Sequence, residues 1–171
     1  SRFPIEEVEE MDREVLEFAG GSGIVATYRL DLDGSAIYVT NLHLETPRAG
    51  LERIRAGRLG SGITKTEGRS MLREVELQRA RLWVDRFQGP HLVLGDFNTP
   101  PESHSFRASW GDWQNAFSLR GRGLGGTRLN GWIRARIDHI LADGSWVVKR
   151  SELGKDAGSD HLPILADLAL R

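Results

Sequence analysis

The 171-residue chain contains no cysteine. That absence excludes disulfide bonds, thiolate nucleophiles and zinc sites built on cysteine. The chain also lacks an apolar run approaching the ~18 residues that cross a bilayer, and it does not open with a signal peptide. Because the first residues do not resemble a natural start, localisation stays open: cytoplasmic or, if a signal or membrane segment lies upstream, extracytoplasmic.

The formal net charge is only −1, which argues against a generic binder of polyanions. The charges are unevenly distributed, however: residues 1–17 carry seven acids, whereas residues 120–136 carry five arginines and no acid. The arginine-rich stretch is suited to binding phosphate and equally suited to a solvated surface loop. With 39% hydrophobic and 27% charged residues, the composition is that of one globular domain over residues 1–171.

Hydrophobic patterning predicts a strand-rich chain with one long helix, hence an α/β or α+β fold with a layered core. Asp33-Gly34 is a two-residue hairpin signal. A helix is expected over residues 69–87, with Met71, Leu72, Val75, Leu82 and Trp83 on its apolar face. Residues 48–68 are expected to form a loop, with a short helix over 49–56. The expected strands cover residues 24–30, 36–44, 91–95, 136–141, 146–148 and 162–170.

Polar side chains recur where these strands end. Asn41, His43 and Glu45 are spaced by two, so they share one face of their strand. The plainer interpretation of this group is the solvent-facing edge of a hairpin. Asp96 and Asn98 follow the apolar run "LVL" in "LVLGDFNTP". A carboxylate and an amide there can bind a metal, move a proton or hold a phosphate oxygen, although Gly-Asp-x-Asn is also good turn chemistry.

Two further strand ends carry acid and imidazole groups. Asp138 lies in the apolar strand "RIDHI", where a buried acid is costly unless a histidine or cation lies nearby. His139 falls on the opposite face of that strand and is expected to pack. Asp160 and His161 precede the last strand in "GSDHLPI" and place a metal-capable oxygen beside a titratable imidazole. A capped turn would also explain that pair.

Taken together, these segments have a recognisable order. The chain presents "NLHLE", the helix "TEGRSMLREVELQRARL", "LVLGDFN", "RIDHIL" and "GSDHLPI", with matching spacing from residue 1 to residue 169. In this it resembles the endonuclease/exonuclease/phosphatase superfamily, the fold of deoxyribonuclease I and of apurinic endonucleases. The resemblance implies a four-layer β-sandwich flanked by helices and a metal-dependent hydrolase of phosphate esters.

The resemblance also implies a role for each matching residue. The expected catalytic residues are His43 (scissile phosphate), Asp96 (attacking water), Asn98 (phosphate oxygen), Asp138 (orientation of the last histidine) and His161 (general base or phosphate-binding imidazole). Asp160 and Asp96 are the expected metal ligands, and Asn41, Arg128 and Arg136 the expected substrate contacts. Hard oxygen ligands suit Mg²⁺ or Mn²⁺ as the cofactor.

The same resemblance exposes a gap at the start of the chain. Family members begin with a strand bearing an asparagine and then a motif whose glutamate is a principal metal ligand, whereas this chain opens on the mid-domain segment "SRFPI". Residues 1–171 are therefore expected to form a partial domain that lacks its N-terminal strands. Nothing in the spacing requires Glu45 to replace the glutamate. Exposed sheet edge and core predict self-association, or complementation by a second fragment.

The family does not define the substrate, because its members act on many phosphate esters. Nucleic acid, a nucleotide, a phosphoinositide and a phospholipid head group all stay open. Trp110, Trp113 and Trp132 could stack on bases or simply pack in the core. The expected function is a metal-dependent phosphoesterase, in a truncated form whose activity stays open. The alternative is a non-catalytic binding or regulatory module that keeps the fold but lacks the metal glutamate.

Overall fold

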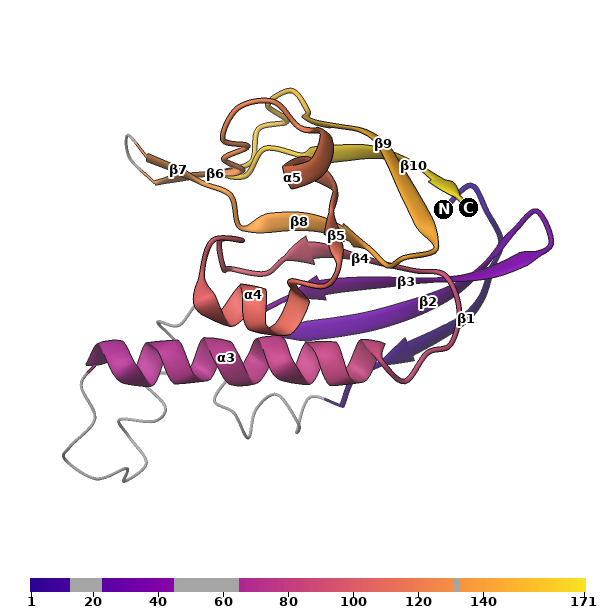
Figure 1. Ribbon diagram of the computed structural model, residues 1–171, viewed down its shortest axis with the longest axis horizontal. Coiled ribbons are helices and arrows are strands. Elements are labelled where there is room, and N and C mark those ends of the chain that lie inside the picture. Colours follow the sequence, from indigo (N-terminus) through magenta and orange to yellow (C-terminus); the bar gives the residue numbers. More distant parts are fainter. Residues whose placement is uncertain (13–22, 45–64, 131–132) are drawn as a thin grey trace.

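The computed structural model describes residues 1–12, 23–44, 65–130 and 133–171 (Figure 1). The strands are β1 (Ile5–Glu10), β2 (Ile24–Leu32), β3 (Ser35–His43), β4 (His91–Asp96), β5 (Gln114–Asn115), β6 (Arg128–Asn130), β7 (Ile133–Ala135), β8 (Asp138–Ala142), β9 (Trp146–Leu153) and β10 (Ile164–Leu170). The helices are α3 (Lys65–Val84), α4 (His104–Trp110) and α5 (Ala116–Arg120). No helix among these residues is long and apolar enough to cross a membrane.

The strands form one large and two small sheets. The large sheet has six strands in the order β1-β2-β3-β4-β8-β5, while β9 pairs with β10 and β6 pairs with β7. Strands β3 and β4 run parallel and the other pairs run antiparallel. The connection from β3 to β4 includes α3, as expected for a parallel crossover. The mixed α/β class expected from the sequence is confirmed.

The main core lies between the large sheet and helices α3 and α4. Apolar side chains from both helices meet alternate side chains of strands β2, β3, β4 and β8. The buried members are Met11, Val25, Leu42, Leu44, Leu77, Ala80, Trp83, Val84, Val93, Phe97, Phe106, Trp110 and Leu141. This layer fixes which face of each strand points away from the helices, and the candidate site lies on that other face.

The opposite face of the large sheet packs against β9 and β10 (Figure 1). Leu30, Ile37, Ala142 and Trp146 are buried there, and Leu168 of β10 packs against them. The short helix α5 packs against β9. The structure is therefore layered, with helices α3 and α4 on one side of the large sheet and the small β9–β10 sheet, with α5, on the other.

The Asp33-Gly34 hairpin is confirmed. Both residues have positive φ, 53° and 88°, which is the requirement of the tight turn that matches strand twist. The backbone N–H of Gly34 donates to the carboxylate of Asp31 at 2.6 Å. Strands β2 and β3 pair without a break from Leu32↔Ser35 to Ile24↔His43.

The long helix differs from its prediction in extent and in orientation. It begins at Lys65, so residues 65–68 are helical rather than loop, and it ends at Val84. Val75 and Leu82, expected on the buried face, are 36% and 67% exposed. Trp83, also expected on the apolar face, is buried in the main core, where Leu77 and Ala80 lie beside it on the stripe that faces the sheet. The predictions for residues 48–64 and for the side chains of Met71 and Leu72 lie outside the described residues.

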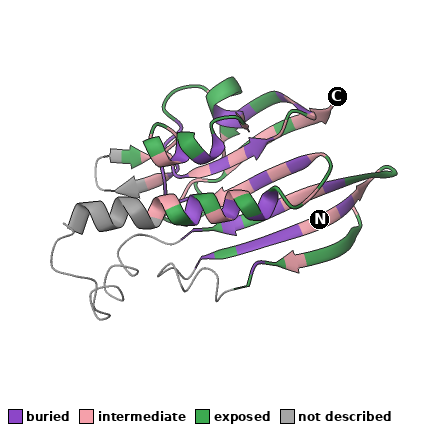
Figure 2. Ribbon diagram, turned by 60° about the horizontal axis from the view of Figure 1, so that its bottom comes forward, coloured by how far each residue is buried: buried purple, intermediate pink, exposed green. Residues whose placement is uncertain are grey.

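The acidic N-terminal segment forms strand β1, which its sequence does not predict. Figure 2 shows it mostly exposed along the border of the large sheet, where it pairs only with β2 among the described strands. Glu6 contacts Arg29 at 3.0 Å and Glu9 contacts Arg86 at 3.7 Å. Charges on an edge strand hinder further strand pairing, which is how natural sheets protect an edge.

A buried polar chain crosses the main core. The indole of Trp83 donates to the hydroxyl of Thr27 at 2.9 Å, and the hydroxyls of Thr27 and Thr40 lie 2.7 Å apart. The Thr40 hydroxyl lies 2.8 Å from Nε2 of His91. One proton assignment satisfies every member: each group donates to the next, and the chain ends on an unprotonated Nε2. Burial lowers the pKa of His91 to about 4, so its imidazole is neutral.

Replacing His91 with Gln should flatten the acid dependence of stability. The pKa of His91 is about 4 in the fold against 6.5 in the unfolded chain, so the unfolded chain binds one more proton between these values. Stability is therefore lost as pH falls from 6.5 to 4, by about 3 kcal/mol for this group. Urea unfolding at pH 7 and pH 4 should show that His91→Gln loses about that much less. Parallel curves would contradict the assignment.

Candidate active site

Asp96 and Asp138 occupy neighbouring strand ends. Asp96 is the last residue of β4 and Asp138 the first of β8, and the two are directly paired across the strands. Val93 and Leu141, each three positions away, point into the helix-facing core, so both carboxylates point to the opposite face. Two acids that lie far apart in sequence are thus adjacent in space.

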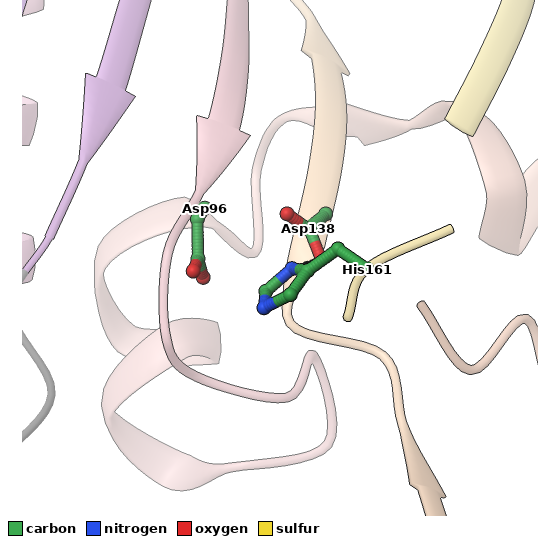
Figure 3. Close-up of side chains that lie close together, drawn as sticks. All are labelled: Asp96, Asp138 and His161. Atoms are coloured by element: carbon green, nitrogen blue, oxygen red, sulfur yellow. Dashed lines mark hydrogen bonds and ion pairs between the residues drawn. The ribbon is translucent and has the colours of Figure 1, made fainter. Parts of the chain in front are cut away.

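His161 completes the group from a third segment. It precedes β10, and its Nδ1 lies 2.8 Å from Oδ2 of Asp138. Figure 3 shows the three side chains directed toward one space from separate parts of the chain. One potential ligand atom from each of Asp96, Asp138 and His161 lies within 4.8 Å of the others. We call these three residues the Asp–Asp–His cluster. The expected histidine partner of Asp138 is thereby present.

The segments that carry Asp138 and His161 are joined through Thr127. The buried hydroxyl of Thr127 accepts from the backbone N–H groups of Ile137 and Asp138 at 3.2 and 3.3 Å. Its backbone carbonyl accepts from the N–H of Leu162 at 2.7 Å. One buried residue therefore contacts the backbone beside both partners of the Asp138–His161 pair. Nothing in the sequence singles out this threonine, because its contacts are to backbone groups distant along the chain.

His43 and Asn41 lie on the same side of the large sheet. His43 pairs with Asp96 across the parallel strands β3 and β4, and its Nε2 lies 3.8 Å from Oδ2 of Asp96. The side chain is 69% exposed, so it is accessible from solvent. Asn41 is exposed two positions earlier on β3. The strand register brings His43, Asp96 and Asp138 into one row across three adjacent strands.

Asp96 lies between His43 and Asp138 in this row, and both neighbours affect its pKa. Burial raises the pKa of its carboxyl above the usual value, and the neighbouring Asp138 carboxylate raises it further. The backbone N–H of Asn98, which donates to Oδ1 at 2.7 Å, opposes this rise, as do His161 and His43. A half-buried acid facing a like charge is a group that a cation would stabilise.

Asn98 has a structural role at this edge as well. Its φ of 48° is left-handed, a conformation that asparagine tolerates better than most residues. Its side-chain Nδ2 donates to the carbonyl of Leu44 at 2.6 Å, which ties this loop to the end of β3. That contact uses one of the two N–H bonds of the amide. The turn interpretation of "GDFN" is therefore correct. The same turn places Asn98 next to Asp96 of the cluster.

Three other residues expected at the site, Asp160, Arg128 and Arg136, are not members of the Asp–Asp–His cluster. Asp160 is largely exposed, and its carboxylate lies 3.9 Å from the guanidinium of Arg128. Arg136 contacts Glu102 at 3.3 Å and lies over the ring of Phe117. Arg128 therefore contacts Asp160, the residue beside His161, whereas Arg136 contacts Glu102 and Phe117.

Two of the three tryptophans that were expected either to stack on bases or to pack lie among the described residues. Trp110 is buried in the main core, and Trp113 packs edge-on against it at a ring distance of 5.6 Å. Glu45 and Trp132 lie outside the described residues. Core packing therefore accounts for Trp110 and Trp113.

The Asp–Asp–His cluster fits a divalent cation. It offers two carboxylates and one imidazole nitrogen, on one face and within reach of a single ion. Carboxylate oxygens are the ligands that Mg²⁺ and Mn²⁺ prefer. Because Nδ1 of His161 is hydrogen-bonded to Asp138, Nε2 is the nitrogen available to an ion, a water molecule or a phosphate oxygen. This donor set suits the hydrolysis of a phosphate ester.

Comparison with known proteins identifies the family. A family model described as the Endonuclease/Exonuclease/phosphatase family matches residues 1–161. The chain belongs to this family. The resemblance read from the sequence motifs is thereby confirmed, and family membership supports a phosphoesterase-type function. No curated protein sequence matches the chain.

Solved structures share the fold at low sequence identity. An endonuclease/exonuclease/phosphatase from Beutenbergia cavernae is 20% identical with a TM-score of 0.70, over 99% of this chain and 46% of that chain. A humanised TDP2 from D. rerio is 14% identical with a TM-score of 0.67, over 96% and 67%. The human Nocturnin catalytic domain with bound sulfate is 18% identical with a TM-score of 0.63, over 99% and 60%.

The match to these structures is partial on their side. The first structures matched are covered over 56% and 46% of their own lengths, so this chain spans about half of each. The similarity establishes the deoxyribonuclease I-like fold for the part that is covered.

Proposed function

We propose that this chain carries the acid–imidazole side of a metal-dependent phosphoesterase site. The observation that supports this most directly is the convergence of Asp96, Asp138 and His161 from three segments, with one potential ligand atom of each within 4.8 Å. Family membership supports the same reaction class. Phosphate-ester hydrolysis requires an oriented water, neutralised phosphoryl oxygens and a stabilised leaving oxygen, and these side chains can supply each.

In this proposal Asp96 accepts the proton of the attacking water or aligns it. Asp138 accepts the Nδ1–H of His161 and so holds the imidazole with Nε2 toward the substrate. A bound Mg²⁺ or Mn²⁺ would polarise the phosphoryl group and offset the charge that develops on it. Asp96 and Asp138 are the carboxylates suited to that ion, in preference to the exposed Asp160.

The groups around the cluster are suited to contact the phosphate. His43 is exposed beside Asp96 and can donate to a phosphoryl oxygen. The remaining N–H of the Asn98 amide can do the same. Arg128 lies at the segment of His161 and supplies a fixed positive charge, and Asn41 extends the exposed polar row along β3.

Phosphate esters are the substrate class that the relatives support. One matched structure is named a mannosyl-6-phosphatase from Bacteroides thetaiotaomicron (20% identity, TM-score 0.57), and the Nocturnin structure holds a sulfate anion. We extend to this chain only what these share, a tetrahedral oxyanion as ligand. Nucleic acids and sugar phosphates both present that group.

Asp96→Ala and His161→Ala should each lower hydrolysis of bis(p-nitrophenyl) phosphate by at least about 100-fold with Mg²⁺ or Mn²⁺ present, because each removes a group that handles a proton or the phosphate. The matched controls replace exposed side chains away from the cluster, Asp167→Ala on β10 and His104→Ala on α4, and should keep the wild-type rate. Circular dichroism checks the fold of each variant.

A rate retained in Asp96→Ala or His161→Ala would overturn the assignment of that residue. Absence of hydrolysis by the wild-type chain with either metal would favour the alternative function, a non-catalytic module that binds or regulates through the same fold.

We also propose that the open side of the small sheet is covered by a second copy of this chain. Among the described strands β10 pairs only with β9, which leaves its other edge without a strand partner. Leu165 on β10 is 50% exposed, and Leu168 and Leu170 are only partly buried. Unpaired backbone groups beside exposed apolar side chains favour edge-to-edge association.

Light scattering across a concentration series should therefore show a dimer or larger species. Leu165→Glu should shift the population toward monomer, because a charge at the contact must be desolvated. Leu124→Glu is the matched control, since Leu124 is 91% exposed but lies outside the strands. A dilute monomer that stays monomeric on concentration would overturn the proposal.

A further inference from the structure

His139 is a buried histidine on the far side of the active-site strand. It follows Asp138 on β8, and because successive residues of a strand alternate, it points into the helix-facing core. The side chain is fully buried and packs against Phe97 and Phe106, with ring distances of 5.2 and 4.7 Å. None of the catalytic roles proposed above uses it.

Two hydrogen bonds determine the protonation of this imidazole. Nε2 lies 2.9 Å from the backbone carbonyl of Thr99, which can only accept, so Nε2 carries the proton. Nδ1 then accepts from the side-chain Nδ2 of Asn115 at 3.2 Å. The other end of that amide accepts from the N–H of Ser118 at the start of α5. Burial lowers the pKa of His139 to about 4, which agrees with a neutral ring.

The Thr99 carbonyl belongs to the loop that carries two proposed site residues. We call residues 96–99 the Asp96–Thr99 loop. In it the Asn98 N–H donates to Asp96 Oδ1 at 2.7 Å, and Asn98 adopts φ of 48°. The Phe97 N–H donates to the carbonyl of Ile137 at 2.9 Å. His139 binds the last residue of this loop and packs on Phe97, so it contacts the loop at two points on the core side.

We propose that His139 is a positioning residue for Asp96 and Asn98. It donates to the Thr99 carbonyl and thereby fixes the Asp96–Thr99 loop in the conformation that directs the Asp96 carboxylate toward Asp138 and His161. Its own orientation is set by Asn115, which links the loop to the first turn of α5. This inference rests on the proposed hydrolytic function for its kinetic consequence, but its structural consequence can be measured without activity.

A pair of amide variants separates the two hydrogen bonds of the ring. His139→Gln keeps a donor where Nε2 meets Thr99, whereas His139→Asn keeps only the contact toward Asn115. With bis(p-nitrophenyl) phosphate and Mn²⁺, His139→Asn should lower kcat by about 10-fold to about 100-fold with KM nearly unchanged, because a displaced reacting group costs rate. His139→Gln keeps the donor to Thr99 but loses the contact to Asn115 that orients the ring, so its kcat should fall less than that of His139→Asn, by under about 10-fold.

His91→Asn is the matched control. His91 is equally buried, lies on the same face of the large sheet and also has a pKa of about 4, but it contacts Thr40 instead of the loop. It should lose stability as His139→Asn does and keep the wild-type kcat. Equal kcat losses in both variants would mean that His139 acts only through core packing, and this result would overturn the inference.

Hydrogen exchange supplies the measurement that needs no activity. The amides of Phe97 and Asn98 should exchange faster in His139→Asn than in His91→Asn or His139→Gln, because only the first frees the Thr99 carbonyl. If the wild-type chain is inactive, the proposed function fails while this comparison still decides the positioning role. Equal protection of these amides in all variants would overturn that role.

Should His139→Asn not fold, Asn115→Ser carries the test. Serine keeps an N-cap oxygen for Ser118 but removes the donor to Nδ1 of His139. We expect a lower kcat and faster hydrogen exchange at the Asn98 amide in this variant. Wild-type values for both would contradict it.

Discussion

The site depends on one unfavourable contact, two carboxylates placed directly opposite each other on adjacent strands. Asp96 and Asp138 are paired by the register of β4 and β8, and like charges in that position destabilise a sheet. The structure offsets the repulsion with an imidazole on Asp138, a backbone N–H on Asp96 and the nearby His43. A cation is the remaining group that would stabilise the arrangement. The proposed function follows from this electrostatic demand.

The backbone that creates the contact is itself closely specified. Gly95 has φ of 137°, and a Cβ there would collide with the carbonyl of Leu42, so β3 can lie against β4 only because this residue has no side chain. Thr127 binds the backbone on either side of the Asp138–His161 pair, and His139 binds the loop after Asp96. Buried polar groups therefore support the exposed ones from the core side.

Local signals in the sequence predict much of this fold, and long-range contacts account for what they miss. Two residues encode the Asp33-Gly34 hairpin. The buried face of α3 is predicted correctly at Trp83 but not at Leu82, because periodicity alone favours the apolar Leu82 over Glu76, which is the buried residue. The order of the motifs predicted that Asp138 orients His161, and the two side chains lie 2.8 Å apart. Spacing alone could not show that the carboxylate of the neighbouring Asp160 is exposed. The sequence does not indicate the role of Thr127, because its partners are backbone groups.

Paramagnetic broadening by Mn²⁺ tests the central claim most directly. Titration of a ¹⁵N-labelled chain with substoichiometric Mn²⁺ should broaden the amide resonances of Asp96, Asp138 and His161 first, since a cation bound between the three side chains lies close to all of them. The acidic strand β1 offers a built-in comparison, because Glu6–Glu10 carry more carboxylates but do not converge with an imidazole. Broadening centred on β1, or spread evenly over the acidic surface, would contradict the account.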